Sequence, residues 1–143
     1  METNYTLCRD PLILLDFFRK VDTTLPVPLS QRINLEAFAH SSVEGTVHCI
    51  CREGQLESAA LVIYGYLDKP FAYLNLLATV PGCEGRGFGS FLLNKAEEAA
   101  RKAGMIEFHL HTNAVNRRAV SLYERKGYRI LEREPKLHMA KTL

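Results

Sequence analysis

The sequence predicts a mixed α/β fold in which a sheet is flanked by helices. Two alternating segments, residues 46–52 and 56–67, are joined by a tight Glu-Gly-Gln turn and indicate a β-hairpin. A third strand, 71–80, runs into a glycine-rich turn that opens a helix, and a further strand follows at 105–112. Hairpins followed by a central strand–helix–strand crossover predict antiparallel and parallel pairing within one mixed sheet.

Length and composition indicate one globular domain over residues 1–143, with 47% hydrophobic and 24% charged residues. The formal net charge of +2 is too small to indicate a nucleic acid or an anionic membrane as a partner. No run approaches the roughly 20 apolar residues of a membrane span. The first residues lack the basic-then-apolar pattern of a signal peptide, so we expect a cytoplasmic protein.

The first third of the chain predicts a short strand over residues 4–8 and two helices. Asp10 and Pro11 have the residue types of an N-cap and a first helical position. We expect Ser30 to cap a second helix and Gly45 to end it. Apolar residues at helical spacing follow both caps: Leu14, Phe17, Phe18 and Val21 in the first helix, and Ile33, Ala37 and Phe38 in the second.

The helix after the glycine-rich turn has the clearest pattern and is expected to end at Gly104. Glu97 and Arg101 are expected to form an i,i+4 ion pair on its exposed side, as are Glu98 and Lys102. One continuous apolar stripe is expected to face the sheet: Phe88, Leu92, Ala96, Ala99 and Ala103.

The last third predicts a strand, a helix over residues 113–126, and two final strands at 128–134 and 136–142. In the strand at 105–112, alternation places the apolar side chains on one face and the polar ones on the other. These are Ile106, Phe108 and Leu110 on the first face, and Glu107, His109 and His111 on the second. The complete order is β-α-α-β-β-β-α-β-α-β-β. The final strand has the position of a possible homodimer edge.

The glycine-rich turn predicts a phosphate site. Gly85, Gly87 and Gly89 leave backbone N–H groups uncovered at the positive end of the following helix. The turn departs from the dinucleotide fingerprint, because Ser90 occupies the position of the third small residue, and it lacks the Gly-Lys-Ser/Thr of a P-loop. The alternative is that these glycines only let the helix pack closely against the sheet.

A second pattern lies near the C-terminus. Asn116, Ala119 and Tyr123 stand at i, i+3 and i+7, on one face of a helix, and Gly127 and Tyr128 follow. The alternative is a purely structural role: an N-cap, a small core residue and a core tyrosine.

Together the two segments resemble the GNAT superfamily of acyl-CoA-dependent N-acyltransferases, over residues 71–128. The family turn Q/R-x-x-G-x-G/A falls on residues 84–89, with Glu84 in the Gln/Arg position. The resemblance implies a mostly antiparallel sheet of six to seven strands with helices on both faces, acetyl-CoA as co-substrate and no metal. It also implies these residues for binding acetyl-CoA: Leu77, Ala78, Thr79, Gly85, Arg86, Gly87, Phe88, Gly89, Ser90, Asn116, Ala119 and Tyr123.

The same resemblance implies direct attack of a primary amine on the thioester. Ala78 would donate its N–H to the developing oxyanion, and Tyr123 would protonate the leaving thiolate. Asn75 stands where many relatives have a glutamate that relays the amine proton, and an amide cannot accept one. The remaining candidates for the base are Asp68, Tyr73, Glu107, His109 and His111.

The missing glutamate favours a weakly basic small-molecule amine as acceptor, such as an amino sugar. Residues 28–34 also resemble a subset of bacterial members presumed to act on amino sugars. Three alternatives stay open: a peptide or lysine acetyltransferase, a non-catalytic acyl-CoA-binding regulatory module, and a nucleotide-binding structural domain. The four cysteines are expected to be reduced, and none has zinc-ligand spacing: Cys8, Cys49, Cys51 and Cys83.

Overall fold

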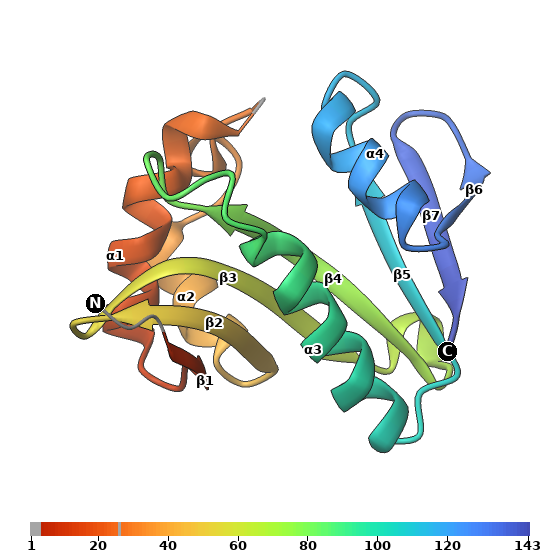
Figure 1. Cartoon of the computed structure of the whole chain (residues 1–143), viewed down its shortest axis with the longest axis horizontal. Coiled ribbons are helices and arrows are strands. Elements are labelled where there is room, and N and C mark those ends of the chain that lie inside the picture. The colour runs from red at the N-terminus through yellow and green to blue at the C-terminus, as the bar shows by residue number, and fades with distance from the viewer. Residues whose placement is uncertain (1–3, 26) are drawn as a thin grey trace. The chain divides into compact units, whose positions relative to one another are not determined.

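The computed structural model describes residues 4–25 and 27–143. Helices and strands follow in the predicted order (Figure 1). They are β1 Asn4–Leu7, α1 Pro11–Val21, α2 Leu35–Ser42, β2 Thr46–Arg52, β3 Gln55–Tyr64, β4 Phe71–Thr79, α3 Phe88–Lys102, β5 Glu107–Thr112, α4 Arg117–Arg125, β6 Arg129–Glu132 and β7 Leu137–Thr142. Short 3-10 turns lie at Asp22–Thr24, Leu29–Gln31 and Tyr66–Asp68.

The strands form a seven-stranded sheet in the order β1-β2-β3-β4-β5-β7-β6. β4 and β5 pair in parallel, and α3 is the crossover between them. The pairs β1–β2, β2–β3, β5–β7 and β6–β7 are antiparallel. The prediction of a mixed, mostly antiparallel sheet with a central strand–helix–strand crossover is therefore confirmed.

The chain divides into two compact units that alternate along the sequence. The first comprises Met1–Val62 and Leu76–Ala96, and the second comprises Ile63–Asn75 and Glu97–Leu143. β4 and α3 each pass from one unit into the other. The expectation of a single domain over residues 1–143 stays a prediction, and the two units are described separately below.

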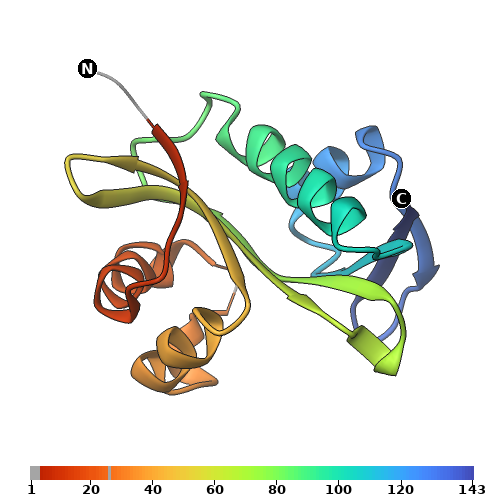
Figure 2. The ribbon, with the colours of Figure 1, turned by 90° about the horizontal axis from the view of Figure 1, so that it is seen from below.

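In the first unit, α1 and α2 cover one face of β2 and β3, and the beginning of α3 lies on the opposite face (Figure 2). The Oδ1 atom of Asp10 accepts a hydrogen bond from the amide of Leu12 at 2.9 Å, so the predicted cap of α1 is confirmed. The predicted stripe of α1 (Leu14, Phe17, Phe18 and Val21) is fully buried in one cluster with residues of β2, β3 and β4. Burial of this apolar stripe holds α1 on the sheet.

The start of α2 was predicted wrongly. Asn34 caps this helix, because its Oδ1 accepts from the amide of Ala37 at 2.9 Å. Ser30 lies instead in a 3-10 turn, where its amide donates to Asp22. Ile33 therefore precedes the helix and is exposed rather than buried.

In the second unit, α4 ends at Arg125, and Gly127, two residues on, has a φ of +94°, the left-handed conformation that favours glycine. The reversal brings the amide of Tyr128 to the carbonyl of Tyr123 at 3.0 Å. The Tyr128 ring then packs edge-on against Phe108, with 6.3 Å between ring centroids. The core of this unit is completed by Leu110, Met139 and Ala140.

The face of α3 was also predicted in part wrongly. Glu97, expected in a surface ion pair, is only 5% exposed. Its two oxygens accept from the hydroxyl of Tyr128 and the ammonium of Lys141, each at 2.9 Å. The buried residues of α3 are Leu92, Leu93, Ala96, Glu97 and Ala100, whereas Ala103 lies exposed after the helix. A buried carboxylate is stable here because both oxygens have a donor.

Several elements are shorter than predicted, among them β6 and α4, which were expected over residues 128–134 and 113–126. β3 ends at Tyr64, since Gly65 turns into the left-handed region and the 3-10 turn Tyr66–Asp68 follows. β5 begins at Glu107, which leaves Ile106 exposed outside the strand.

Candidate active site

The residues predicted to form the site are divided between the two units. Leu77–Thr79 and Gly85–Ser90 belong to the first unit. Asn116, Ala119 and Tyr123 belong to the second, together with most of the side chains that could accept a proton. Each set is therefore described within its own unit.

Left-handed glycines precede α3, whereas Gly89, predicted in the turn, is the second residue of the helix. Gly82, Gly85 and Gly87 have φ values of +90°, +78° and +77°, a region that other residues enter only at a cost. A Cβ atom added at any of these glycines would meet nothing within 4 Å. Close packing against the sheet therefore does not explain these three glycines, whereas the left-handed backbone does.

α3 begins directly after this turn, at Phe88. The amide of Phe91 donates to the carbonyl of Gly87 at 3.0 Å, which makes Gly87 the N-terminal cap. The amides of Phe88, Gly89 and Ser90 therefore have no acceptor within the helix. Such amides, at the positive end of the helix dipole, are suited to bind phosphate oxygens.

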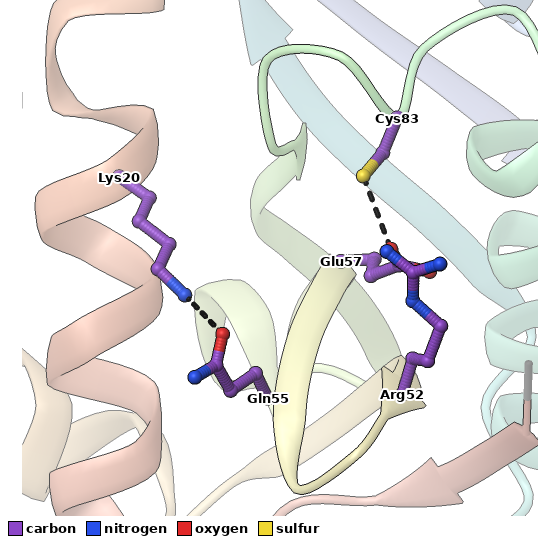
Figure 3. A network of polar contacts seen from close by, with 5 residues as sticks. All are labelled: Lys20, Arg52, Gln55, Glu57 and Cys83. Carbon is purple, nitrogen blue, oxygen red and sulfur yellow. Dashed lines mark hydrogen bonds and ion pairs between the residues drawn. The ribbon is translucent and has the colours of Figure 1, made fainter.

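A polar network anchors the start of the turn to β3 (Figure 3). The thiol of Cys83 donates to Oε2 of Glu57 at 3.2 Å, and the guanidinium of Arg52 pairs with the same oxygen at 2.9 Å. Burial and the adjacent Glu57 raise the pKa of the Cys83 thiol, which disfavours the reactive thiolate. Cys83 thus has the surroundings of an anchoring residue. Figure 3 also shows the ammonium of Lys20 in α1 donating a hydrogen bond to the side chain of Gln55, at 2.8 Å.

Along β4, the alternation between residues whose backbone groups face β3 and residues whose groups face away is interrupted. The carbonyl of Phe71 accepts from the amide of Gly65 at 2.9 Å, on the side of β3. The amide of Val80, just past the end of β4, donates to Glu57 of β3 at 2.8 Å. Residues that face the same neighbouring strand should be an even number of positions apart, and these two are an odd number apart. β4 therefore contains an extra residue, as in a β-bulge.

Side-chain contacts indicate which edge of β4 Ala78 faces. The carbonyl of Ala78 accepts from the buried hydroxyl of Ser58 in β3 at 3.0 Å, and that hydroxyl also contacts Thr79 Oγ1 at 2.9 Å. Because Ala78 faces β3, the backbone groups of Leu77 and Thr79 are directed to the other edge of the strand. Leu77 and Thr79 therefore present their amides away from β3.

In the second unit, Asn116 caps α4, and its Oδ1 accepts from the amide of Ala119 at 3.4 Å. Tyr123, two turns further along, is only 6% exposed, and its ring packs against Tyr128 with 5.9 Å between centroids. Burial raises the pKa of Tyr123 to about 12. The helix therefore holds a neutral phenol, a group that can donate a proton.

Four of the five candidate bases lie together on one face of the second unit. His109 Nε2 lies 2.8 Å from Oε1 of Glu107, and the hydroxyl of Tyr73 lies 2.7 Å from His111 Nδ1. His109 Nδ1 is also 2.9 Å from Nε2 of His138, which sequence reasoning missed. The β5–β7 pairing places His138 opposite His111, and this register is a long-range feature that local patterns do not contain.

Two absences hold for residues 4–25 and 27–143. No group of three or more His, Cys, Asp or Glu side chains is placed to hold a metal ion. Among the helices of the same residues, none combines the length and hydropathy that a membrane crossing requires.

Comparison with known proteins gives the same family as the two motifs. Residues 13–128 match the family described as Acetyltransferase (GNAT) family. No curated protein sequence matches the chain.

Solved structures share its fold. A GNAT-family acetyltransferase from Staphylococcus aureus Mu50 aligns with a TM-score of 0.81 and 16% identity over 99% of both chains. The PaiA N-acetyltransferase of Thermoplasma acidophilum, in complex with coenzyme A, aligns with 0.78 and 16% over the whole of both. The ribosomal-protein-S18-alanine N-acetyltransferase of Escherichia coli aligns with 0.79 and 17% over 99% of this chain and 94% of that one. Because the family match covers most of the sequence, the chain belongs to the GNAT family of acetyltransferases, which are acyltransferase enzymes that use acetyl-CoA.

Proposed function

We propose that this protein transfers an acetyl group from acetyl-CoA to the primary amine of a small molecule, by direct attack of the amine on the thioester. The observation that carries the proposal is the turn before α3, where left-handed glycines open a helix whose first amides have no acceptor within it. Residues Gly85–Ser90 would hold the pyrophosphate, and the edge formed by Leu77–Thr79 would pair with the pantetheine.

The amide that stabilises the developing negative charge comes from the same strand. Sequence reasoning assigned this role to Ala78, whose carbonyl contacts Ser58 on the β3 side. The phase of β4 directs the amide of Leu77 to the opposite edge, which makes Leu77 the better-oriented donor of the two. An amide fixed in a strand costs no reorganisation when charge develops.

Tyr123 would protonate the leaving thiolate of coenzyme A. Its pKa of about 12 exceeds the roughly 8.5 of a thiol, so transfer to a fully hydrated thiolate is uphill by about 5 kcal/mol. The step becomes less uphill where the thiolate is also poorly solvated, because desolvation raises the thiol pKa in the same way. Asn116 and Ala119 lie on the same face of α4 and would line the donor site.

The test is release of coenzyme A thiol from acetyl-CoA with a panel of amines. The panel contains glucosamine, a small diamine, a lysine peptide and a peptide with N-terminal alanine. We expect turnover with a weakly basic small amine, such as the amino sugar, to exceed turnover with the lysine peptide. Thiol release with none of the amines, despite acetyl-CoA binding, would instead support the non-catalytic module.

A protein N-terminus is the second candidate acceptor. The Escherichia coli enzyme of the same fold is a ribosomal-protein-S18-alanine N-acetyltransferase, and an α-amino group is also weakly basic, with a pKa near 8. A preference for the alanine peptide over glucosamine would decide for this alternative.

A further inference from the structure

A tyrosine–histidine pair lies where the pairing of β4 and β5 ends. The hydroxyl of Tyr73 in β4 is 2.7 Å from Nδ1 of His111 in β5. The last pair of the parallel ladder is Leu74↔Leu110, so the contact spans the final paired position of the two strands. Asn75, whose side-chain amide cannot act as a base, follows Leu74 in β4.

Aromatic rings hold this pair on both sides. The ring of Tyr66 stacks on Tyr73 with 4.4 Å between centroids, and the ring of His138 stacks on His111 at 4.4 Å. Tyr66 is presented by a strained turn, in which Leu67 and Asp68 have φ values of +60° and +56° without being glycine. Backbone strain of this kind clusters at functional sites, because the fold must supply the energy to hold it.

The three histidines of this face differ in access. His109 is 3% exposed and is held between Glu107 and His138. It therefore fixes the position of His138 but cannot meet a bound amine. His138 is partly buried, whereas His111 is exposed and is therefore the most accessible of the three to a substrate.

We propose that the Tyr73–His111 pair accepts the proton that the acceptor amine loses, an inference that rests on the proposed acetyl transfer. In the tautomer with hydrogen on Nε2, His111 accepts the hydrogen bond of the Tyr73 hydroxyl at Nδ1. The amine gives a proton to the Tyr73 oxygen while the hydroxyl proton moves to Nδ1. One N–H bond of the amine breaks, one N–H bond of the imidazole forms, and Tyr73 ends as the neutral phenol it was.

The charges around the pair fit this relay. Burial is the main cause that lowers the pKa of His111; Lys136 and His109 lower it further, and Glu132 opposes them. Burial also lowers the pKa of His138, whose ring stacks on that of His111. Neutral imidazole, the form that accepts a proton, is therefore present at pH 7. Burial also raises the pKa of Tyr73 to about 12, so a relay through the neutral phenol is easier than formation of a phenolate.

The relay also favours one class of acceptor. An imidazole with a pKa below its usual 6.5 takes a proton from an amine of pKa near 8 with a penalty of about 30-fold or more. From a lysine-like amine of pKa near 10.4 the penalty is about 10⁴-fold. The pair therefore suits weakly basic amines such as amino sugars.

The experiment compares Tyr73→Phe and His111→Gln with the wild type, with glucosamine and the alanine peptide as probes. Tyr5→Phe is the matched control, because its hydroxyl makes the same 2.7 Å contact with His48 Nδ1, in the other unit. At pH 7 we expect both test variants to lose about 30-fold or more in kcat. Their Kd for coenzyme A should stay within about twofold, and Tyr5→Phe should retain wild-type turnover.

The pH dependence separates a relay from a structural role. Above the pKa of the amine the substrate arrives unprotonated, so the deficit of both variants should shrink as pH rises towards 9. A deficit of equal size at every pH, or no deficit at all, would overturn the relay while leaving acetyl transfer intact. A wild type inactive with every amine would overturn the proposed function and the relay together. Because His111 is exposed, His111→Gln gives the result if Tyr73→Phe is poorly folded.

Discussion

The two units carry different kinds of candidate group. The first unit offers backbone: the left-handed glycines before α3 and the edge of β4 at Leu77 and Thr79. The second unit offers titratable side chains, chiefly Tyr123, Tyr73 and His111. Backbone amides do not change charge with pH, whereas phenols and imidazoles move protons. We therefore expect changes in the glycine turn of the first unit to alter the affinity for acetyl-CoA, and changes to the side chains of the second unit to alter turnover.

The two tyrosine–histidine pairs show that a contact alone does not mark a site. Tyr5 meets His48 in the first unit with the same 2.7 Å separation that joins Tyr73 to His111 in the second. His48, however, is 1% exposed, and burial lowers its pKa to about 4. His48 is thus a neutral core residue, whereas His111 is open to a substrate.

The largest expected effect is on turnover, in the second unit. Tyr123→Phe removes the proposed proton donor but keeps the ring that packs on Tyr128. We expect kcat to fall by about 100-fold or more, as is usual for loss of a general acid, with little change in the Kd for coenzyme A. Steady-state kinetics and calorimetric titration measure the two quantities. An unchanged kcat would remove Tyr123 from the mechanism.

A smaller effect, on affinity, is expected in the first unit. Gly87→Ala places a Cβ on a residue with φ of +77°, a strain of about 1–2 kcal/mol that shifts the turn. We expect the KM for acetyl-CoA to rise about tenfold while kcat changes little. Gly54→Ala is the matched control, since Gly54 has φ of +78° and equal space but lies at a hairpin tip. Equal losses in both variants would mean general destabilisation instead.

The anchor beneath the turn should have a weaker effect of the same kind. Glu57→Gln removes the charge that pairs with Arg52 and accepts from Cys83. Looser positioning of the turn should raise the Kd for coenzyme A by about threefold, the size of one ordinary hydrogen bond. Turnover at saturating acetyl-CoA should be unaffected. A fall in kcat with unchanged Kd would place Glu57 in the chemistry and break the division between the units.

The smallest expected effect concerns pH: the kcat of the wild type should not fall in the alkaline range. An acid is active while protonated, and the pKa of Tyr123 is raised to about 12, so its active form persists up to that pH. The kcat of the wild type should show no loss between pH 8 and about 10 from ionisation of a phenol. Suppose instead that the kcat of the wild type falls with an apparent pKa well below 12 while the residual rate of Tyr123→Phe does not. That result would contradict the burial of this hydroxyl.

Much of the fold could be predicted because its signals are local. Asp10 and Pro11 determine where α1 begins, and the glycines before Phe88 determine where α3 begins. The errors arose where a local signal competed with a distant contact. The i,i+4 spacing of Glu97 and Arg101 indicates a surface ion pair, yet Tyr128 and Lys141 bury Glu97 from far along the chain.

The two motifs of the candidate site are local signals too, and the roles assigned to their residues stay predictions. The glycine turn and the face of α4 are continuous in sequence, so both motifs could be recognised. Ser30 and Asn34 are both good caps, and only the 3-10 turn at Leu29–Gln31 decides between them. His138 joins His109 and His111 only through the β5–β7 register, which no single segment encodes.

The central claim, that backbone amides of the glycine turn hold the acyl donor, is tested most directly by amide NMR. The ¹⁵N-labelled protein is titrated with coenzyme A, and the signals of Gly85, Gly87, Phe88 and Gly89 are followed, with Gly54 as internal reference. We predict large, saturable shifts of the four turn amides with one common Kd, and no shift of Gly54. Saturable binding of coenzyme A that leaves the four turn amides unmoved would contradict it.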